Sequence, residues 1–195
     1  KDNYSKIIDI FYGQLVSQIS IMKNNKLHLE STTYSPICFF SLPIPDNETC
    51  NIFDCFDLFT KDNILENDSQ WKCDKTNQYY DASLKKIFWK FPSILIVSFK
   101  RFDNFGRKKN IKIDFPLNSL DLTKYCIGYD KHKSYFDLYG ICNHSGGTEG
   151  GHYTAFVKNA NDNWYLFNDT TVSRVSENNL KTKNAYCFFY RKKIL

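Results

Sequence analysis

The residues best suited to do chemistry are a histidine and an asparagine at the ends of two strand-like segments. His152 follows a glycine pair and opens an alternation of apolar and polar residues, while Asn168 and Asp169 close the next apolar segment. An imidazole oriented by a side-chain oxygen is the usual form of a general base that activates a nucleophile. No residue of the chain is an evident candidate for that nucleophile.

A hairpin would bring the histidine and its partner together. If Phe156 pairs with Trp164 ahead of a polar turn, His152 lies directly opposite Asn168, on the same face, with Cβ atoms about 4.5–5.5 Å apart. A slip of one residue would put Asp169 there instead. In either register a side-chain oxygen can accept the imidazole Nδ1–H, so we expect Nε2 to be left free to take a proton.

An asparagine in the orienting position indicates which nucleophile to expect. Its amide holds the ring but does little to stabilise an imidazolium, which suffices for a cysteine, because a thiol gives up its proton more easily than a hydroxyl. A Cys-His-Asn arrangement is a known variant of the catalytic triad. Asp169 could add a second hydrogen bond or negative potential. The alternative interpretation is a histidine with a purely structural hydrogen bond.

The segment that leads into His152 is rich in glycine. Residues 145–151 contain four glycines, which permit positive φ and a close approach of substrate to the backbone. No lysine follows, and a strand rather than a helix comes next, so this is no phosphate-binding loop. A flexible connection between two strands is the alternative.

The rest of the chain predicts a sheet that positions these residues, with few helices. We expect one clear helix at 51–60 and a polar, protruding region at 63–81. The run 94–97 is typical of a strand covered on both faces, and residues 102–107 predict a turn. The other expected strands are 5–21, 34–42, 110–115, 134–143, 153–157, 164–168 and 186–190.

Composition excludes several classes of protein. The chain has 195 residues, enough for one domain or part of one, and its 17% aromatic content favours a folded, strand-rich protein. The net charge is +5, and the lysines and arginines are scattered along the sequence, which argues against a nucleic-acid binder. No apolar run reaches the roughly 20 residues of a membrane span. No initiator methionine or signal peptide is visible, so we expect a piece of a longer protein.

The cysteines indicate where the protein works. There are seven, at irregular spacing, and several lie among apolar residues. An odd number without a pattern argues against a disulfide framework, and buried free thiols suit a reducing compartment. We therefore expect the cytoplasm, with the nucleus as an alternative.

Residues 143–155, Asn-His-Ser-Gly-Gly-Thr-Glu-Gly-Gly-His-Tyr-Thr-Ala, closely resemble the histidine box of the ubiquitin-specific proteases. Residues 164–172 resemble the segment with the family's third catalytic residue, and 185–190 resemble its closing strand. The likeness extends in order over nearly the whole chain. Further matching segments are 11–15, 40–45, 55–59, 98–102 and 114–117.

The resemblance implies an α+β, papain-like fold of fingers, palm and thumb, mainly antiparallel sheet with few helices. It implies a cysteine hydrolase that cleaves after the C-terminal glycine of ubiquitin, with ubiquitin and ubiquitinated proteins as partners and no cofactor. His152 would be the base, Asn168 the orienting residue and Asp169 an auxiliary acid. His144 and the glycine loop would form a blocking loop that closes over the ubiquitin tail, and residues 103–108 would form the other blocking loop. The residues that would contact the ubiquitin tail are His144, Ser145, Gly146, Gly147, Gly150, Gly151 and Tyr153.

Two departures from the family pattern matter. The N-terminal cysteine box is missing, along with most of the thumb, so residues 1–195 would be the fingers and palm of one catalytic domain, completed by an upstream thumb segment. Of the two Cys-X-X-Cys pairs that bind zinc in many members, the first is replaced around 21–24. The second keeps only Cys73, with Thr76 at the other position. Since structural zinc needs four ligands, we expect no metal.

Three hypotheses remain. The first is the C-terminal part of an active deubiquitinase whose nucleophile lies upstream. The second is a ubiquitin-binding pseudoenzyme or regulatory fragment without a nucleophile, which the missing cysteine box suggests. The third is a β-rich domain with an incidental contact between His152 and Asn168, which the length of the resemblance disfavours.

Overall fold

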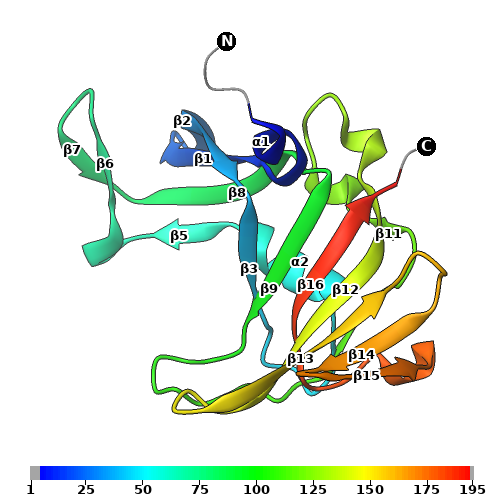
Figure 1. Cartoon of the computed structure of the whole chain (residues 1–195). Helices are drawn as coiled ribbons and strands as arrows, with labels where there is room; N and C mark the ends of the chain where they lie inside the picture. Colours follow the sequence, from blue (N-terminus) through cyan, green and yellow to red (C-terminus); the bar gives the residue numbers. More distant parts are fainter. Residues whose placement is uncertain (1–4, 194–195) are drawn as a thin grey trace.

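The computed structural model describes residues 5–193, which form two main sheets with helix α2 behind the larger one (Figure 1). In chain order the helices and strands are α1 (Lys6–Phe11), β1 (Gly13–Lys23), β2 (Lys26–Ile37), β3 (Phe39–Pro43), β4 (Cys50–Asn51), α2 (Ile52–Thr60), β5 (Asn63–Leu65), β6 (Trp71–Cys73), β7 (Gln78–Tyr80), β8 (Ala82–Lys90), β9 (Ile94–Lys100), β10 (Ile113–Asp114), β11 (Leu120–Asp121), β12 (Tyr135–Gly146), β13 (Gly151–Lys158), β14 (Trp164–Asn168), β15 (Thr171–Val175) and β16 (Ala185–Lys192).

The larger sheet has eight strands in the order β15-β14-β13-β12-β16-β9-β3, with β11 beside β12. Its pairs are antiparallel except that of β3 with β9. The smaller sheet, β2-β1-β8-β5, is antiparallel throughout. Within residues 5–193 there are two α-helices, so the predicted α+β class with a mainly antiparallel sheet is confirmed.

One aromatic core joins the two sheets and the helix. Phe88 of β8 stacks on Phe91 with ring centroids 4.3 Å apart and lies 5.0 Å from Phe40 of β3. Phe56 of α2 packs against Phe40 at 5.9 Å. Because aromatic contacts at these distances are favourable beyond their buried area, the sheets hold one another in place. The larger sheet is therefore a rigid support for the β12–β14 segment.

Helix α2 confirms the prediction for 51–60, and its start is encoded locally. The Asn51 side chain accepts hydrogen bonds from the backbone N–H of Phe53 and Asp54, at 2.8 and 3.0 Å. The Asp54 carboxylate accepts one from the Asn51 N–H at 2.8 Å, which completes a capping box. Ile52, together with Cys55 and Phe56, turns a buried face towards the core.

The prediction of a strand over 5–21 is wrong for its first half, where helix α1 forms. Ser5 caps this helix by accepting the N–H of Ile7 at 3.2 Å, and no residue of it is buried. The strand starts only at Gly13, where a Cβ atom would lie 2.4 Å from the Lys90 carbonyl oxygen. A short apolar run does not by itself separate a helix from a strand, and here the cap decided the outcome.

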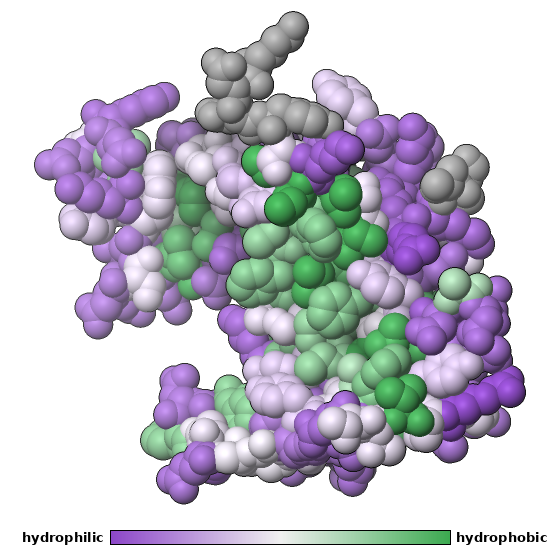
Figure 2. Space-filling model, in the orientation of Figure 1, coloured by the Kyte–Doolittle hydropathy of each residue, from purple (hydrophilic) through white to green (hydrophobic). Residues whose placement is uncertain are grey.

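Three other expected strands differ in detail. The stretch 34–42 is broken at Cys38 between β2 and β3, and 110–115 contributes only the two residues of β10, paired in parallel with β4. Strand β9 is not covered on both faces, since Leu95 and Val97 are buried while Ile94 and Ile96 are half-buried. The half-buried face belongs to a mostly apolar band over the centre of the molecule (Figure 2).

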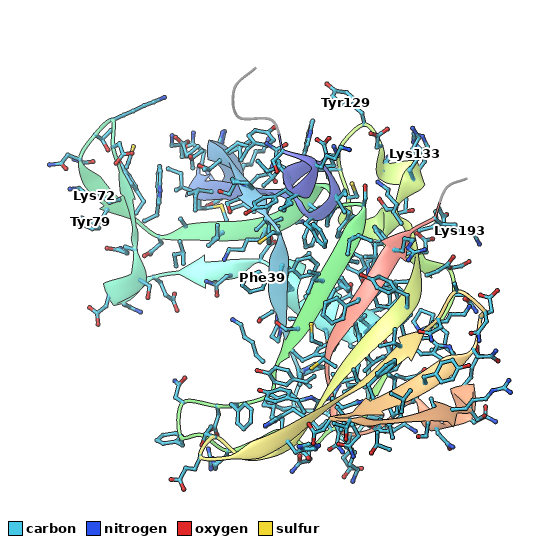
Figure 3. All side chains as sticks on the ribbon, viewed as in Figure 1. Phe39, Lys72, Tyr79, Tyr129, Lys133 and Lys193 are labelled. Atoms are coloured by element: carbon cyan, nitrogen blue, oxygen red, sulfur yellow. The ribbon has the colours of Figure 1, made fainter. Side chains whose placement is uncertain are left out.

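The polar region 63–81 forms β5, a short 3-10 turn and the hairpin of β6 and β7, which extends away from the rest of the molecule (Figure 1). Near its end Lys72 lies over the ring of Tyr79, with 5.9 Å between the ammonium nitrogen and the ring centroid (Figure 3). In residues 5–193, neither α-helix has the length and apolar sequence needed to cross a lipid bilayer.

Candidate active site

His152 is the second residue of β13, the strand that lies between β12 and β14. It pairs with Ser145 of β12, whose hydroxyl donates to the His152 carbonyl oxygen at 3.3 Å. The imidazole side chain is 49% exposed, so the fold leaves part of the ring open to solvent. A histidine in this position is held by its backbone and can still be reached by another group.

The predicted register of the β13–β14 hairpin is wrong by two residues. Phe156 pairs with Leu166, and Lys158 is the residue opposite Trp164. The turn is tighter than expected because Asn159 N–H donates to the Asn163 carbonyl at 3.0 Å. An even shift keeps every side chain on its predicted face, since side chains alternate with a period of two.

His152 and Asn168 therefore meet diagonally across the hairpin. The ladder ends at the pair of Ala155 and Phe167, beyond which the two side chains reach each other with 2.6 Å between His152 Nε2 and Asn168 Oδ1. The structure thus corrects the expected nitrogen, which was Nδ1. Two residues placed diagonally across a hairpin are farther apart than two directly opposite residues. The ring nitrogen farther from the backbone, Nε2, therefore makes the contact.

This contact fixes the protonation pattern of the ring. The Asn168 Oδ1 atom is only an acceptor, so His152 Nε2 must carry the hydrogen and donate it. In the neutral imidazole Nδ1 then holds the free lone pair, and no hydrogen bond among residues 5–193 occupies it. His152 is arranged to accept a proton at Nδ1.

Asp169 stands beside this pair without taking part in it. It occupies the two-residue turn between β14 and β15, with a φ of 49°, and its Oδ2 lies 4.0 Å from His152 Nε2. Its side chain is 77% exposed. Asp169 can stabilise a protonated imidazole electrostatically, but it does not orient the ring.

The glycines of the loop before His152 fall into two groups. A Cβ atom on Gly151 would lie 2.3 Å from His144 Nε2, and one on Gly146, whose φ is 101°, would lie 2.5 Å from the Gly150 carbonyl oxygen. Gly147 and Gly150 have nothing within 4 Å of such an atom. Two glycines are needed by the fold itself, and the other two leave open space over the exposed loop.

His144 is placed differently from the other residues expected to contact a substrate. Its side chain is buried, with ring centroids 4.7 Å from Tyr153 and 5.7 Å from Tyr186. Tyr153 is exposed and covers it. Tyr153 and the loop are thus the surface that a ligand would meet, and His144 supports that surface from below. The exposed members of the predicted set are Ser145, Gly146, Gly147, Gly150, Gly151 and Tyr153.

None of the seven cysteines, all of which are free, is hydrogen-bonded to His152 within residues 5–193. Burial raises the pKa of the Cys50, Cys55 and Cys142 thiols and raises the pKa of Cys187 to about 12. A thiol in such surroundings stays protonated and is a poor nucleophile. Cys73, whose pKa is lowered by a hydrogen bond from Thr76, lies on the distant hairpin (Figure 1).

The end of the smaller sheet has polar contacts of its own at the place where the family resemblance would put metal ligands. Lys23 forms an ion pair with Glu30 at 2.6 Å and lies close enough to Cys73 to interact electrostatically. Among the residues that the structure describes, no three His, Cys, Asp or Glu side chains are grouped so that they could hold a metal ion.

Sequence reasoning assigned no individual role to two residues that build the surroundings of the site. Lys108 donates to His144, and Arg101, which is fully buried, donates to three backbone carbonyls. The signal for Arg101 was its place between Phe99 and Phe102, at the end of an apolar segment. Lys108 lay in a basic run that reads as solvent-exposed.

Comparison with known proteins gives one family. Residues 1–190 match the family model described as "Ubiquitin carboxyl-terminal hydrolase". Human "Ubiquitin carboxyl-terminal hydrolase 21" is 37% identical over 195 residues, which are 96% of this chain and 34% of that protein. "Ubiquitin carboxyl-terminal hydrolase 5" of Saccharomyces cerevisiae is 34% identical over 207 residues, covering 97% and 25%.

A solved structure gives the same result. The "SAGA Ubp8/Sgf11/Sus1/Sgf73 DUB module bound to ubiquitin aldehyde" contains a chain that superposes with a TM-score of 0.83 at 30% identity. The match covers 100% of this chain and 44% of that one. This chain spans a quarter to a third of the length of the two curated relatives named above.

Proposed function

This chain belongs to the ubiquitin carboxyl-terminal hydrolase family, and we propose that it supplies the base and the orienting residue of a deubiquitinating cysteine hydrolase. The observation that carries the proposal is the 2.6 Å contact between His152 Nε2 and Asn168 Oδ1 beside an exposed glycine loop. The substrate is ubiquitin joined through its C-terminal glycine to another protein. The nucleophile is a cysteine outside residues 1–195.

The first step is activation of the cysteine. The thiol gives its proton to His152 Nδ1, which leaves a thiolate and an imidazolium whose Nε2–H still donates to Asn168. The Asp169 carboxylate, at 4.0 Å, favours the charged ring. None of the thiols with a raised pKa suits this role, which supports a nucleophile outside the chain.

The second step is acyl transfer. The thiolate attacks the carbonyl carbon of the terminal glycine, and the imidazolium gives its Nδ1 proton to the departing amine, which leaves a thioester on the cysteine. Water then attacks the thioester while Nδ1 takes its proton, and the cysteine sulfur leaves as a thiolate. The Nδ1 proton then returns to the thiolate, which restores the thiol and the neutral ring, so one histidine serves both halves of the reaction.

The shape of the molecule supports a protein substrate rather than a small one. Figure 2 shows a hollow bounded by the smaller sheet with its hairpin and by the loops next to the site. Phe39, which is 62% exposed, lies on β3 near this hollow (Figure 3). We assign the hollow to the body of ubiquitin, and the glycine loop with Tyr153 to its extended tail, which needs close approach to the backbone.

The same proposal covers the parts of the domain that residues 1–195 do not supply. We infer that these residues are the fingers and palm of a single catalytic domain and that a thumb segment carries the cysteine. The exposed apolar side chains of α1 support a further packing partner there, since Ile7 is 64% and Ile8 48% exposed. We also propose a cytoplasmic location, or a nuclear one, since free thiols suit a reducing compartment.

A covalent probe tests this function. The full-length protein that contains this chain should form an adduct with ubiquitin that bears an electrophile at its C-terminus. A folded protein that forms no adduct would overturn the proposal. Calorimetry with unmodified ubiquitin would then decide for the alternative, a pseudoenzyme that binds ubiquitin without cleaving it, if it detects binding.

The glycine loop provides a graded test. Gly151→Ala should lower kcat/KM by roughly 100-fold, because its Cβ would lie 2.3 Å from His144 Nε2 and 2.5 Å from the Ser145 carbonyl oxygen and so displace the residue before the base. The matched control is Gly147→Ala, where nothing lies within 4 Å. Hydrolysis of a fluorogenic ubiquitin amide measures both. Equal losses in the two variants would contradict the steric explanation.

A further inference from the structure

Two surface loops from distant parts of the sequence lie side by side next to the site. Residues 103–108 follow β9, residues 145–150 form the end of β12 and its connection to β13, and both segments extend to the same side of the molecule (Figure 1). They touch at Gly106, where a Cβ atom would lie 3.1 Å from Thr148 Oγ1. The φ of Gly106 is 74°, so the turn needs glycine there for its backbone as well.

Lys108 makes the polar connection between the first loop and His144, the β12 residue that directly precedes residues 145–150. Its ammonium donates to the His144 carbonyl oxygen at 2.6 Å and to His144 Nδ1 at 3.2 Å. No carboxylate among residues 5–193 forms an ion pair with it, although six other lysines and Arg107 each have one. Burial and the nearby Arg101 guanidinium lower the pKa of Lys108. A lysine held by neutral acceptors alone is fixed by geometry rather than by charge pairing.

The contact also determines the state of His144. Burial and, to a lesser extent, the Lys108 ammonium lower the pKa of this imidazole, so it is neutral at pH 7. With Nδ1 accepting from the ammonium, the hydrogen sits on Nε2, the nitrogen next to Gly151. The other groups around the ring are Phe102, Tyr153 and Tyr186. Lys108 thereby orients the side chain that underlies Tyr153 and the residue before His152.

The loop that carries Lys108 is itself stiff. The Asp103 carboxylate accepts the N–H groups of Phe105 and Arg107, each at 2.9 Å, and the Arg107 Nε at 2.7 Å. At its base the buried Arg101 donates to the carbonyls of Lys109 and Ile111, both at 2.9 Å. A movement of this loop must therefore occur as a unit, and Lys108 transmits it to the other loop.

We propose that Lys108 is a positioning residue that fastens the two loops into one unit, so that they open and close together over the substrate. The role in substrate capture rests on the proposed function, whereas the mechanical coupling of the loops does not. The occupant of the space that they cover is an extended peptide tail, because four glycines leave the backbone of residues 145–151 exposed next to Tyr153.

Amide hydrogen exchange of the full-length protein tests the coupling without any need for catalysis. Lys108→Met keeps the aliphatic stem and removes the ammonium, and we expect exchange to become faster in both 103–108 and 145–150. The control is Lys112→Met, an exposed lysine with no hydrogen bond to another described residue, which should leave both loops unchanged. Faster exchange in one loop alone, or in neither, overturns the proposal.

Two further readouts separate positioning from general stability and from activity. The core strands β9 and β12 serve as internal reference, and faster exchange there as well would make Lys108 a general stabiliser and overturn the proposal. In an active enzyme Lys108→Met should raise KM by roughly tenfold with little change in kcat, since His152 and Asn168 keep their contact. An equal loss in kcat would contradict it. If the wild type forms no ubiquitin adduct, the proposed function fails while the exchange result still decides the coupling.

Discussion

Replacing His152 with glutamine is expected to lower kcat/KM for a ubiquitin amide by about 10³- to 10⁴-fold. A glutamine amide N–H can still donate to Asn168 Oδ1, as His152 Nε2 does at 2.6 Å. It offers no basic nitrogen in place of Nδ1, so the thiol of the nucleophile stays protonated. The variant therefore removes proton transfer while leaving the local hydrogen bond possible. Steady-state kinetics of the full-length protein with a fluorogenic ubiquitin amide measure the loss.

His132→Gln is the matched control. This histidine lies in the exposed 3-10 turn Lys131–Lys133, away from the loops, and the same change there should leave kcat/KM near that of the wild type. Activity of His152→Gln within about tenfold of the wild type would exclude His152 as the general base, because such a base contributes at least about 100-fold.

The strands that carry the site could be predicted because their side chains alternate. β14 covers Trp164–Asn168, as predicted from its run of aromatic and apolar residues, and β13 and β16 extend their predicted cores by a few residues. α2 was predictable for a second reason, since an apolar period near four residues coincides with a local cap at Asn51. In both cases the information lies within about ten residues of sequence.

The register of the hairpin could not be read in the same way. It depends on how tightly residues 159–163 turn, and that turn places Asp162 at a φ of 62°, a conformation that its sequence does not require. An error of two residues preserved the face of each side chain but changed the ring nitrogen that meets Asn168. The sequence therefore predicted that His152 and Asn168 meet, but not the strand register or the ring nitrogen through which they meet.

Contacts between distant segments were beyond sequence reasoning altogether. Lys108 and His144 are 36 positions apart, and Arg101 and Ala185 are 84 apart. Each contact joins a side chain to a backbone carbonyl, and a carbonyl is present at every residue, so no residue type marks the partner. Only the folded sheets bring these groups within reach. The positioning of the loops is thus a property of the tertiary structure.

Substitutions of Asn168 and Asp169 distinguish the two candidates for the orienting residue. Asn168→Ala should lower kcat/KM by roughly 100-fold, because it removes the acceptor that holds His152 Nε2 at 2.6 Å. Asp169→Asn should cost less than about tenfold, since an exposed charge pair contributes about 1 kcal/mol or less. The Asp169 carboxylate is 77% exposed and lies 4.0 Å from the ring, which places it in that class.

A third variant makes this comparison sharper. Asn168→Asp keeps an acceptor oxygen beside the imidazole and adds a negative charge that stabilises the imidazolium, so it should retain most of the wild-type activity. Steady-state kinetics with the fluorogenic ubiquitin amide measure all three variants. A larger loss from Asp169→Asn than from Asn168→Ala would reverse the assignment. Asp169 would then orient the base, and the contact to Asn168 would be a feature of the fold alone.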